Sequence, residues 1–546
     1  MIMKNLLMVL SLFYSYCLYA QVEPANEVME INNIKALVNA NGSLFSDEGE
    51  GQFIPGGITE PQLSAILNSG IWIVGLDEAA NLKGAINYYN SDFEPGTITR
   101  ENDQELKVTS LNKIWRVTKE EIEMHRADFA DNGIIDDPIN NIFAWPGSRN
   151  PFFSEYNDGM VLPISATQGL ASFADTNGDA IYEPDAGDFP VLDIRGCYQP
   201  LPIPDELFWF VYHDISAHDE SQMTSLNVEV QCQIFAFNCD ENTPNGNTIY
   251  TSHKIINHSK EKLSDTYVGL FTDFNIGNKE DDFFGCDPDR SLTFAYNGDD
   301  NDEGGYGTES PVMAVDVLRT PFDEDLTFVD LKAVLPIESM TLNEPYNYYN
   351  LLKGLHSDGS TLPNNGLFYT DNPSDSNGWS EITEENIPGD RKVLTSYGPF
   401  PFPVASGHEF IVAYTFYQEP GNDRIENINM MYDQSDQIQS FFDNCFNNNN
   451  NAACNISTST QNEPLITSRV KIFPNPTQGE FNIQSDEFGI EKVELIDVSG
   501  RIVLKKEWTN SISNPSLSIQ HLPKGLYFLQ LDLENNEQVF KKIVMQ

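Results

Sequence analysis

The sequence has little positive charge. Its 546 residues include 31 Lys and Arg against 82 Asp and Glu, which gives a formal net charge of −51. Nucleic acids and anionic membranes are bound through basic surfaces, so neither is an expected partner. The acidity favours solubility and supplies many oxygen ligands for divalent cations. With 40% hydrophobic and 11% aromatic residues, the chain still has enough apolar material for a core.

Long apolar runs are absent beyond the N-terminus. There, Lys4 precedes an apolar stretch from Leu6 to Tyr19, and Ala20 ends a segment typical of a cleavage site. This pattern predicts a secretory signal peptide over residues 1–20. A lipoprotein anchored through Cys17 is the alternative, which the bulky Tyr16 disfavours. No other stretch approaches the ~20 apolar residues of a spanning helix, so we expect no transmembrane segment.

Sequence signatures of common enzymes are also missing. The chain has no HExxH, no GxSxG, no P-loop and no CxxC. The spacings of His213 with His218 and of His253 with His258 suit no shared metal, so we interpret these histidines as structural. Paired carboxylates for glycoside hydrolysis remain open, because proximity in so acidic a sequence carries no information. We therefore expect no catalytic residues, and favour a protein that is not an enzyme.

Cysteines are few, and export changes their interpretation. Removal of the signal peptide takes Cys17 with it and leaves an even number in an oxidising compartment, which favours disulfides. Buried free thiols are the alternative. Spacing alone does not select among the possible pairings. The remaining cysteines are Cys197, Cys232, Cys239, Cys286, Cys445 and Cys454.

The last segment, residues 470–546, has the pattern of a small β-sandwich. Apolar and polar residues alternate through Val493, Glu494 and Leu495, and Ser499-Gly500 is a tight-turn pair before the next apolar strand. Further turn signals, at 522–525 and 535–536, separate two more strands.

This segment resembles the type A C-terminal sorting domain of type IX secretion cargo. The matching stretches are Phe473-Pro474-Asn475-Pro476, Gly479, Phe481, 497–501, 523–527 and 541–544. The resemblance implies an Ig-like sandwich that binds an outer-membrane secretion translocon, and a secreted or cell-surface location. The residues expected to carry the sorting signal are Pro474, Asn475, Pro476, Gly500, Gly525, Lys541 and Lys542.

The rest of the chain is predicted to consist mainly of strands. Residues 226–237 alternate strictly, with Val228, Val230 and Cys232 on one face. Two helices are predicted, one after the capping box of Thr118 and Glu121 and one within 423–446. The fold class is mainly β, with one or two β-sandwich-type units, few helices and a small Ig-like domain. The predicted regions are a signal peptide (1–20), an N-terminal β-rich region (21–196), a sandwich-like body closed by a helix (197–446), an Asn/Ser/Thr-rich linker (447–469) and the sorting domain (470–546).

An acidic loop at residues 175–188, "DTNGDAIYEPDAGD", predicts a calcium site. Asp175, Asn177 and Asp179 occupy positions 1, 3 and 5 of a calcium-loop pattern, and the Ile181 carbonyl occupies position 7. Calcium takes about six to eight hard oxygen ligands, which such alternation can supply. Two positions depart from the pattern, because Ala180 replaces the usual glycine and Ala186 the closing glutamate. Asp185 or Asp188 would have to close the site, and we favour Asp188; the alternative is a solvated acidic turn.

A second acidic stretch, which begins at Asp273, shows no fixed spacing between its carboxylates. Uncompensated carboxylates at this density repel one another, and a bound cation would relieve the repulsion. A third stretch, residues 297–305, is a weaker case of the same kind. The predicted ligands of the second cluster are Asp273, Asp281, Asp282 and Asp287.

The body itself resembles large secreted proteins of unassigned activity that carry the same sorting domain. The shared segments include "GIWIVGLD", "WPGSRN" and "FADTNGDAIYEPDAGDFPVL". This resemblance implies extracellular cargo and no particular reaction. We therefore expect a calcium-stabilised β-rich protein with a binding or structural role, whose ligand is an extracellular glycan or protein. The alternative is a secreted hydrolase acting on extracellular polysaccharide.

Overall fold

The chain divides into two compact units, Met1–Ser457 (the body) and Thr458–Gln546 (the C-terminal unit), which are described separately. The predicted signal peptide lies outside the described residues. No helix within the described ranges is both long and apolar enough to cross a membrane. The computed structural model describes residues 23–47, 49–56, 63–101, 104–108, 111–162, 170–197, 201–446, 453–454, 470–473, 477, 479–485, 489–497, 502–512, 514–520, 522, 524–534 and 538–545.

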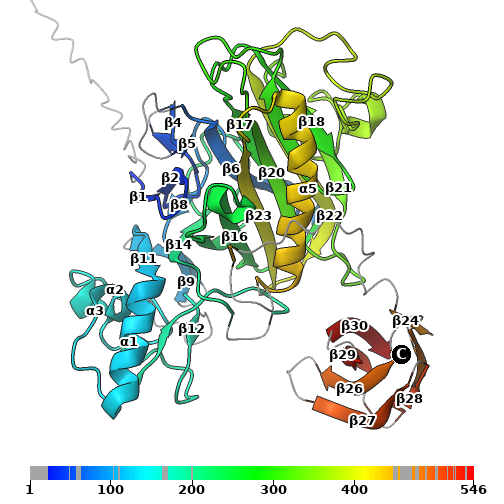
Figure 1. Cartoon of the computed structure of the whole chain (residues 1–546). Helices are drawn as coiled ribbons and strands as arrows, with labels where there is room; N and C mark the ends of the chain where they lie inside the picture. The colour runs from blue at the N-terminus through cyan, green and yellow to red at the C-terminus, as the bar shows by residue number, and fades with distance from the viewer. Residues whose placement is uncertain are drawn as a thin grey trace, which may run out of the picture. The chain divides into compact units, whose positions relative to one another are not determined.

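The body is a sandwich of two antiparallel sheets (Figure 1). The first sheet runs in the order β1 (Asn26–Met29), β2 (Ile34–Asn39), β5 (Phe53–Pro55), β6 (Ile66–Leu76), β17 (Leu263–Phe274), β22 (Arg391–Phe402) and β21 (Leu331–Pro336), with β7 (Leu82–Ile86) also paired to β6. The second runs β11 (Trp115–Thr118), β14 (Glu206–His213), β15 (Val228–Ala236), β16 (Thr248–Asn257), β23 (Gly407–Tyr417), β20 (Val312–Arg319), β19 (Leu292–Asn297) and β18 (Asp282–Asp287), with β8 (Glu94–Pro95) also paired to β14.

Alternation along the strands builds the core between the sheets. In β15, Val228, Val230 and Cys232 all point into this core and are fully buried, as the sequence pattern predicts. The intervening Glu229 lies on the opposite face, where it accepts hydrogen bonds from the Thr97 hydroxyl and the Ile98 N–H. Each fully buried aliphatic side chain contributes about 1.5–3 kcal/mol, so the core is the main source of the body's stability.

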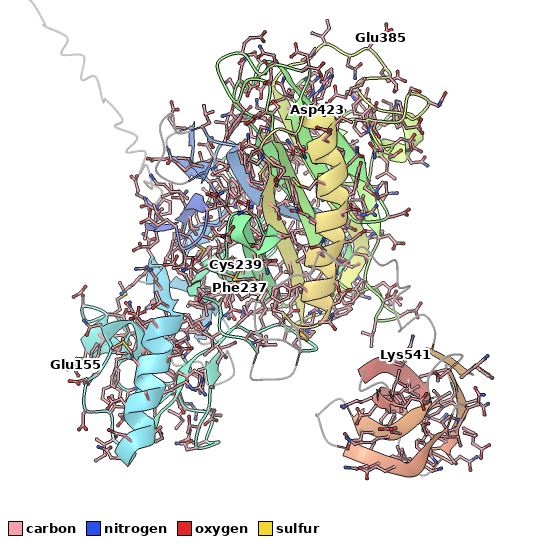
Figure 2. The ribbon with its side chains drawn as sticks, viewed as in Figure 1. Glu155, Phe237, Cys239, Glu385, Asp423 and Lys541 are labelled. Carbon is pink, nitrogen blue, oxygen red and sulfur yellow. A yellow bond between two sulfur atoms is a disulfide. The ribbon has the colours of Figure 1, made fainter. Side chains whose placement is uncertain are left out.

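Helices cover the outer faces of both sheets. Helix α5 (Arg424–Asp443) packs Ile428, Met431 and Ile438 on the second sheet, and crosses β20 and β23 in Figure 1. Helix α4 (Pro345–Leu352) covers the first sheet. Figure 2 shows Asp423 at one end of α5 and Phe237 near the other, where its ring centroid lies 5.6 Å from that of Phe441.

The two predicted helices are confirmed. Helix α1 (Lys119–Asn132) starts at a capping box in which the Glu121 N–H donates to Thr118 Oγ1 (3.3 Å) and the Thr118 N–H donates to Glu121 Oε2 (2.8 Å). The mainly β fold is also confirmed. The remaining elements are α2 (Asn140–Phe143), α3 (Phe153–Tyr156), the paired short strands β3 (Ser46–Asp47) and β4 (Glu50–Gly51), β9 (Thr97–Glu101) and β10 (Gln104–Val108), β12 (Phe173–Ala174) and β13 (Phe189–Pro190), and 3-10 turns at Pro184–Ala186, Pro244–Asn247 and Pro363–Gly366.

The predicted regions 21–196 and 197–446 share both sheets. Strand β6 of the first region pairs with β17 of the second, and β11 pairs with β14 in the same way. A cut at 196 would therefore divide each sheet, and the two regions fold as one unit.

Two disulfides attach the chain after α5 to the body. Cys197 pairs with Cys445, and Cys239 pairs with Cys454. Cys454 belongs to the predicted linker 447–469, so this point of the linker is covalently bound to the body. Cys232 and Cys286 are buried free thiols, so the cysteines divide between the two interpretations that the sequence left open.

The C-terminal unit consists of two antiparallel sheets. Their inner faces share an apolar core that includes Phe481, Val493, Leu495 and Leu529. This arrangement agrees with the predicted small sandwich. One sheet runs β24 (Val470–Phe473), β25 (Glu480–Ser485) and β28 (Ser516–Ser518); the other runs β27 (Ile502–Ile512), β26 (Ile490–Asp497), β29 (Gly525–Leu533) and β30 (Gln538–Met545).

Candidate functional site

The predicted calcium loop, residues 175–188, is closed at its base by the short strands β12 and β13. Phe173 pairs with Pro190, and Ala174 pairs with Phe189. The Tyr182 side chain anchors the loop: its ring is fully buried and its hydroxyl donates to the Ile142 carbonyl (2.7 Å). The loop is therefore held at both ends and in its middle.

The first half of the loop is organised around the Asp175 carboxylate. Its Oδ1 accepts from the Gly178 N–H (2.6 Å) and its Oδ2 from the Ala180 N–H (2.8 Å). Asn177 Oδ1 accepts from the Asp179 N–H (3.1 Å), and Asp179 Oδ1 from the Ile181 N–H (2.8 Å). Ala180 adopts a φ of 62°, the left-handed conformation for which this position usually uses glycine.

Asp188 closes the loop from its other end. The side chain is fully buried; its Oδ1 accepts from the Thr176 N–H (2.7 Å) and its Oδ2 from the Glu183 N–H (2.9 Å). Burial raises the pKa of Asp188, and the negative charge of Asp175 adds to that rise, although the hydrogen bonds oppose it. The Asp188 carbonyl oxygen lies 3.0 Å from His125 Nε2, which fixes the loop against α1.

The loop thus brings Asp188 next to Asp175, while Asp185 stays exposed. Each carboxylate oxygen has more than one lone pair, so a hydrogen-bonded oxygen can still bind a cation. Over the described ranges, no three or more His, Cys, Asp and Glu side chains form a group that could hold a metal ion. A cation site here would therefore need the Asn177 amide and main-chain oxygens as well.

The structure separates the members of the second predicted cluster. Asp273 lies 3.8 Å from Lys392 Nζ, and Asp287 forms a 2.6 Å ion pair with Arg290. Burial raises the pKa of Asp273 to about 7. Asp281 and Asp282 lie instead beside Asp302, which belongs to the third acidic stretch and was not among the predicted ligands. The density of acids in both stretches was a signal for this grouping, but their pairing needed the fold.

A groove of about 640 Å³ lies between α5, the turn from β18 to β19, and the end of β20 with the residues that follow it. Arg290, Arg319 and the half-exposed ring of Phe328 line it. Both guanidinium groups have carboxylate partners: Arg290 bonds Asp436 (2.8 Å) and Arg319 bonds Glu409 (3.0 Å). No sequence pattern predicted this groove, because its walls come from segments that are distant in the chain.

The predicted sorting-signal residues lie partly outside the described residues, namely Pro474, Asn475, Pro476 and Gly500. Gly525 begins β29 and pairs with Met545. Lys541 and Lys542 lie in β30, which forms the edge of its sheet. Figure 2 labels Lys541 on this strand.

Comparison with known families gives one match in this part of the chain. Residues 471–546 match the family described as the secretion system C-terminal sorting domain. The C-terminal unit is a type IX secretion sorting domain. The protein is accordingly secreted or displayed at the outer cell surface, and its sorting domain interacts with the secretion machinery.

Two further likenesses are weak. An endo-acting ulvan lyase of Formosa agariphila is 29% identical over 93 residues, which is 16% of this chain and 17% of the lyase. The chain thus matches less than a fifth of that relative's length. A polysaccharide lyase of solved structure aligns with a TM-score of 0.18 and 8% identity over 58% of this chain and 34% of the lyase. A TM-score this low supports no conclusion.

Proposed function

We propose that the sorting domain delivers a calcium-stabilised β-sandwich to the cell exterior, where the body has a binding or structural role. The arrangement of loop 175–188 carries this proposal. Hydrogen bonds organise Asp175, Asn177 and Asp179 in the first half of that loop, and Asp188 lies near Asp175 in a segment closed at its base. These are the hard oxygen donors that calcium prefers.

Calcium would offset a specific electrostatic cost in this loop. Asp188 is buried near the negative Asp175, and main-chain N–H groups of Thr176 and Glu183 donate to its carboxylate. A divalent ion held between them would neutralise both carboxylates. Since a calcium ion at such a site binds only the folded loop, it should stabilise the body by mass action.

The test is the melting temperature of the purified full chain with and without calcium. Extracellular calcium modules bind at about 10⁻⁴–10⁻³ M, so millimolar calcium should add about 1 kcal/mol per site. Asp179→Ala should remove the part of the shift that this loop supplies. Asp185→Ala is the matched control, because Asp185 is an exposed acid of the same loop outside the hydrogen-bonded group.

Ionic screening is the competing explanation, since any salt reduces repulsion in a chain of charge −51. Sodium chloride at matched ionic strength distinguishes the two. If sodium chloride raises the melting temperature as much as calcium does, and Asp179→Ala responds like the parent, the loop is only a solvated acidic turn.

A secreted enzyme acting on polysaccharide is the second candidate. The groove at Arg290, Arg319 and Phe328 has a volume in the range of ligand pockets, about 300–1,000 Å³, and contains an aromatic ring beside two carboxylate-paired guanidinium groups. The ulvan lyase likeness points the same way, although a shared sorting domain of similar length would account for a 93-residue alignment.

A glycan-array screen with turnover assays on anionic polysaccharides tests the second candidate. New reducing ends or unsaturated products that depend on Arg319 would establish the enzyme. Binding without turnover, lost in Phe328→Ala, would instead support the binding role.

A further inference from the structure

A second group of buried acids lies in two loops at one end of the body sandwich. The loop between β17 and β18 supplies Asp281, and β18 itself begins with Asp282. The loop between β19 and β20 supplies Asp302. Asp282 is fully buried and Asp302 is 1% exposed.

Residues 276–278 hold these carboxylates together. The Ile276 N–H donates to Asp282 Oδ2 (2.9 Å), and the Asn278 N–H donates to Asp302 Oδ1 (3.1 Å). The Asn278 side-chain amide donates to Asp281 Oδ2 (3.0 Å). Gly277 makes this possible, because a Cβ there would lie 2.0 Å from Asp302 Oδ2. The loop is thus built to pass directly against a buried carboxylate.

Three buried oxygens in this group accept no hydrogen bond from the described protein: Asp281 Oδ1, Asp282 Oδ1 and Asn297 Oδ1. Asn297 is fully buried and stands directly opposite Asp282 in the β18–β19 register. Cross-strand partners place their Cβ atoms about 4.5–5.5 Å apart on one face. A buried polar atom without a partner costs free energy, and the cost is greater for a charged one.

The neighbouring cations compensate this charge only in part. The Arg391 guanidinium faces Asp282 but donates to both oxygens of Glu381 (2.9 and 2.8 Å). Lys279, in the same loop, is exposed. Arg424 forms an ion pair with Asp300, another acid of the third stretch (3.2 Å), and donates to the main-chain carbonyl of Asn297 rather than to its side chain (2.9 Å). Additional negative groups, Asp299 and Glu303, face the cluster.

Protonation alone does not resolve the arrangement. Burial and the nearby Asp302 raise the pKa of Asp281 to about 6, and burial raises the pKa of Asp282 well above its ordinary value. A proton on Asp282 Oδ1 would donate to one of the two other unpartnered oxygens and leave the remaining one without a partner, whereas a cation would satisfy all three at once.

We propose that Asp281, Asp282 and Asn297 bind a calcium ion at this end of the sandwich, with Asp302 adding negative charge beside it. Two carboxylates and one amide oxygen supply part of the coordination shell, and main-chain oxygens and water supply the rest. The described part of the chain contains no metal-binding group of three or more His, Cys, Asp and Glu side chains. The proposed site has only two such side chains, so that finding does not conflict with it. The site shares no residue with loop 175–188, so either site can be present without the other.

The test is the number of calcium ions bound per purified full chain, measured by equilibrium dialysis, together with the melting temperature. Asp282→Asn keeps an acceptor for the Ile276 N–H but removes the charge. We expect it to lower the bound calcium by about one ion per chain, and to raise the melting temperature in chelator while reducing the rise that calcium causes. Asp281→Asn, at a partly exposed position, repeats the test if Asp282→Asn does not fold.

Glu303→Gln is the matched control, because it removes an exposed acid of the same cluster and should leave the bound calcium unchanged. Measurements in an Asp179→Ala background separate this site from loop 175–188. If Asp282→Asn and Asp281→Asn both bind as much calcium as the parent, the proposal is wrong whatever the other loop does. If Asp179→Ala alone leaves binding unchanged, only the function proposed for loop 175–188 fails.

Discussion

The disulfides allow a quantitative prediction about the segment after α5. Cys239 and Cys454 join residues that are 215 apart in the sequence, and Cys197 and Cys445 join residues 248 apart. In the chain-entropy model, closing a loop of this length lowers the entropy of the unfolded chain and so raises its free energy by about 5 kcal/mol. The two loops overlap, so the second bond adds less than the first. Because measured effects are typically about 2–4 kcal/mol, we expect a loss of that size from Cys239→Ser/Cys454→Ser.

The assay is urea unfolding at equilibrium, with and without reductant. The double variant should have a lower midpoint than the parent, and reductant should lower the parent's midpoint by a larger amount than the variant's. Phe237, which packs on Phe441 and Phe446, retains these contacts in the variant. The loss should therefore reflect the missing covalent bond rather than a lost core.

Mass mapping of alkylated thiols checks the pairing itself. In the unfolded, non-reduced mature protein, alkylation should modify Cys232 and Cys286 and leave Cys239 and Cys454 unmodified. Labelling of Cys239 or Cys454, or a parent midpoint that reductant does not change, would refute the reasoning.

Three further predictions rest on single features. Ala180→Gly should raise the unfolding free energy by about 0.5–1 kcal/mol, because glycine adopts the φ of 62° without the steric cost that a Cβ imposes; urea unfolding in calcium-free buffer measures it. Burial raises the pKa of Asp316 from 3.8 to about 7, so its contribution to stability is present below about pH 4 and is lost as the pH rises through 7. Asp316→Asn should therefore flatten the pH dependence of the melting temperature and stabilise the protein at pH 8, by at most about 4 kcal/mol; an unchanged pH profile would contradict this. Deletion of residues 471–546 should keep the protein inside the cell envelope, and surface labelling of the truncated protein at the parental level would show that the sorting domain is dispensable.

Local patterns in the sequence were sufficient to predict the mainly β fold, two of its helices and the delivery route. The alternation through Val228, Val230 and Cys232 predicts a strand and its core face, because side chains of a strand alternate regardless of what the strand packs against. The capping box of Thr118 and Glu121 likewise involves only residues three apart. The sorting domain was recognisable for the same reason: its motifs are contiguous and keep their order within one short segment.

Only the tertiary structure decided which distant residues meet. Cys239 could have paired with any other cysteine, and the pairing with Cys454 depends on where α5 ends. The second acidic cluster shows the same limit. Asp273 and Asp287 acquire cationic partners, whereas Asp281 and Asp282 join Asp302 from another loop. Charge density along a sequence shows how many carboxylates lie close together in the chain. The free energy of each carboxylate, however, depends on its burial and on its partners in space. The pairing of strands determines that burial and those partners.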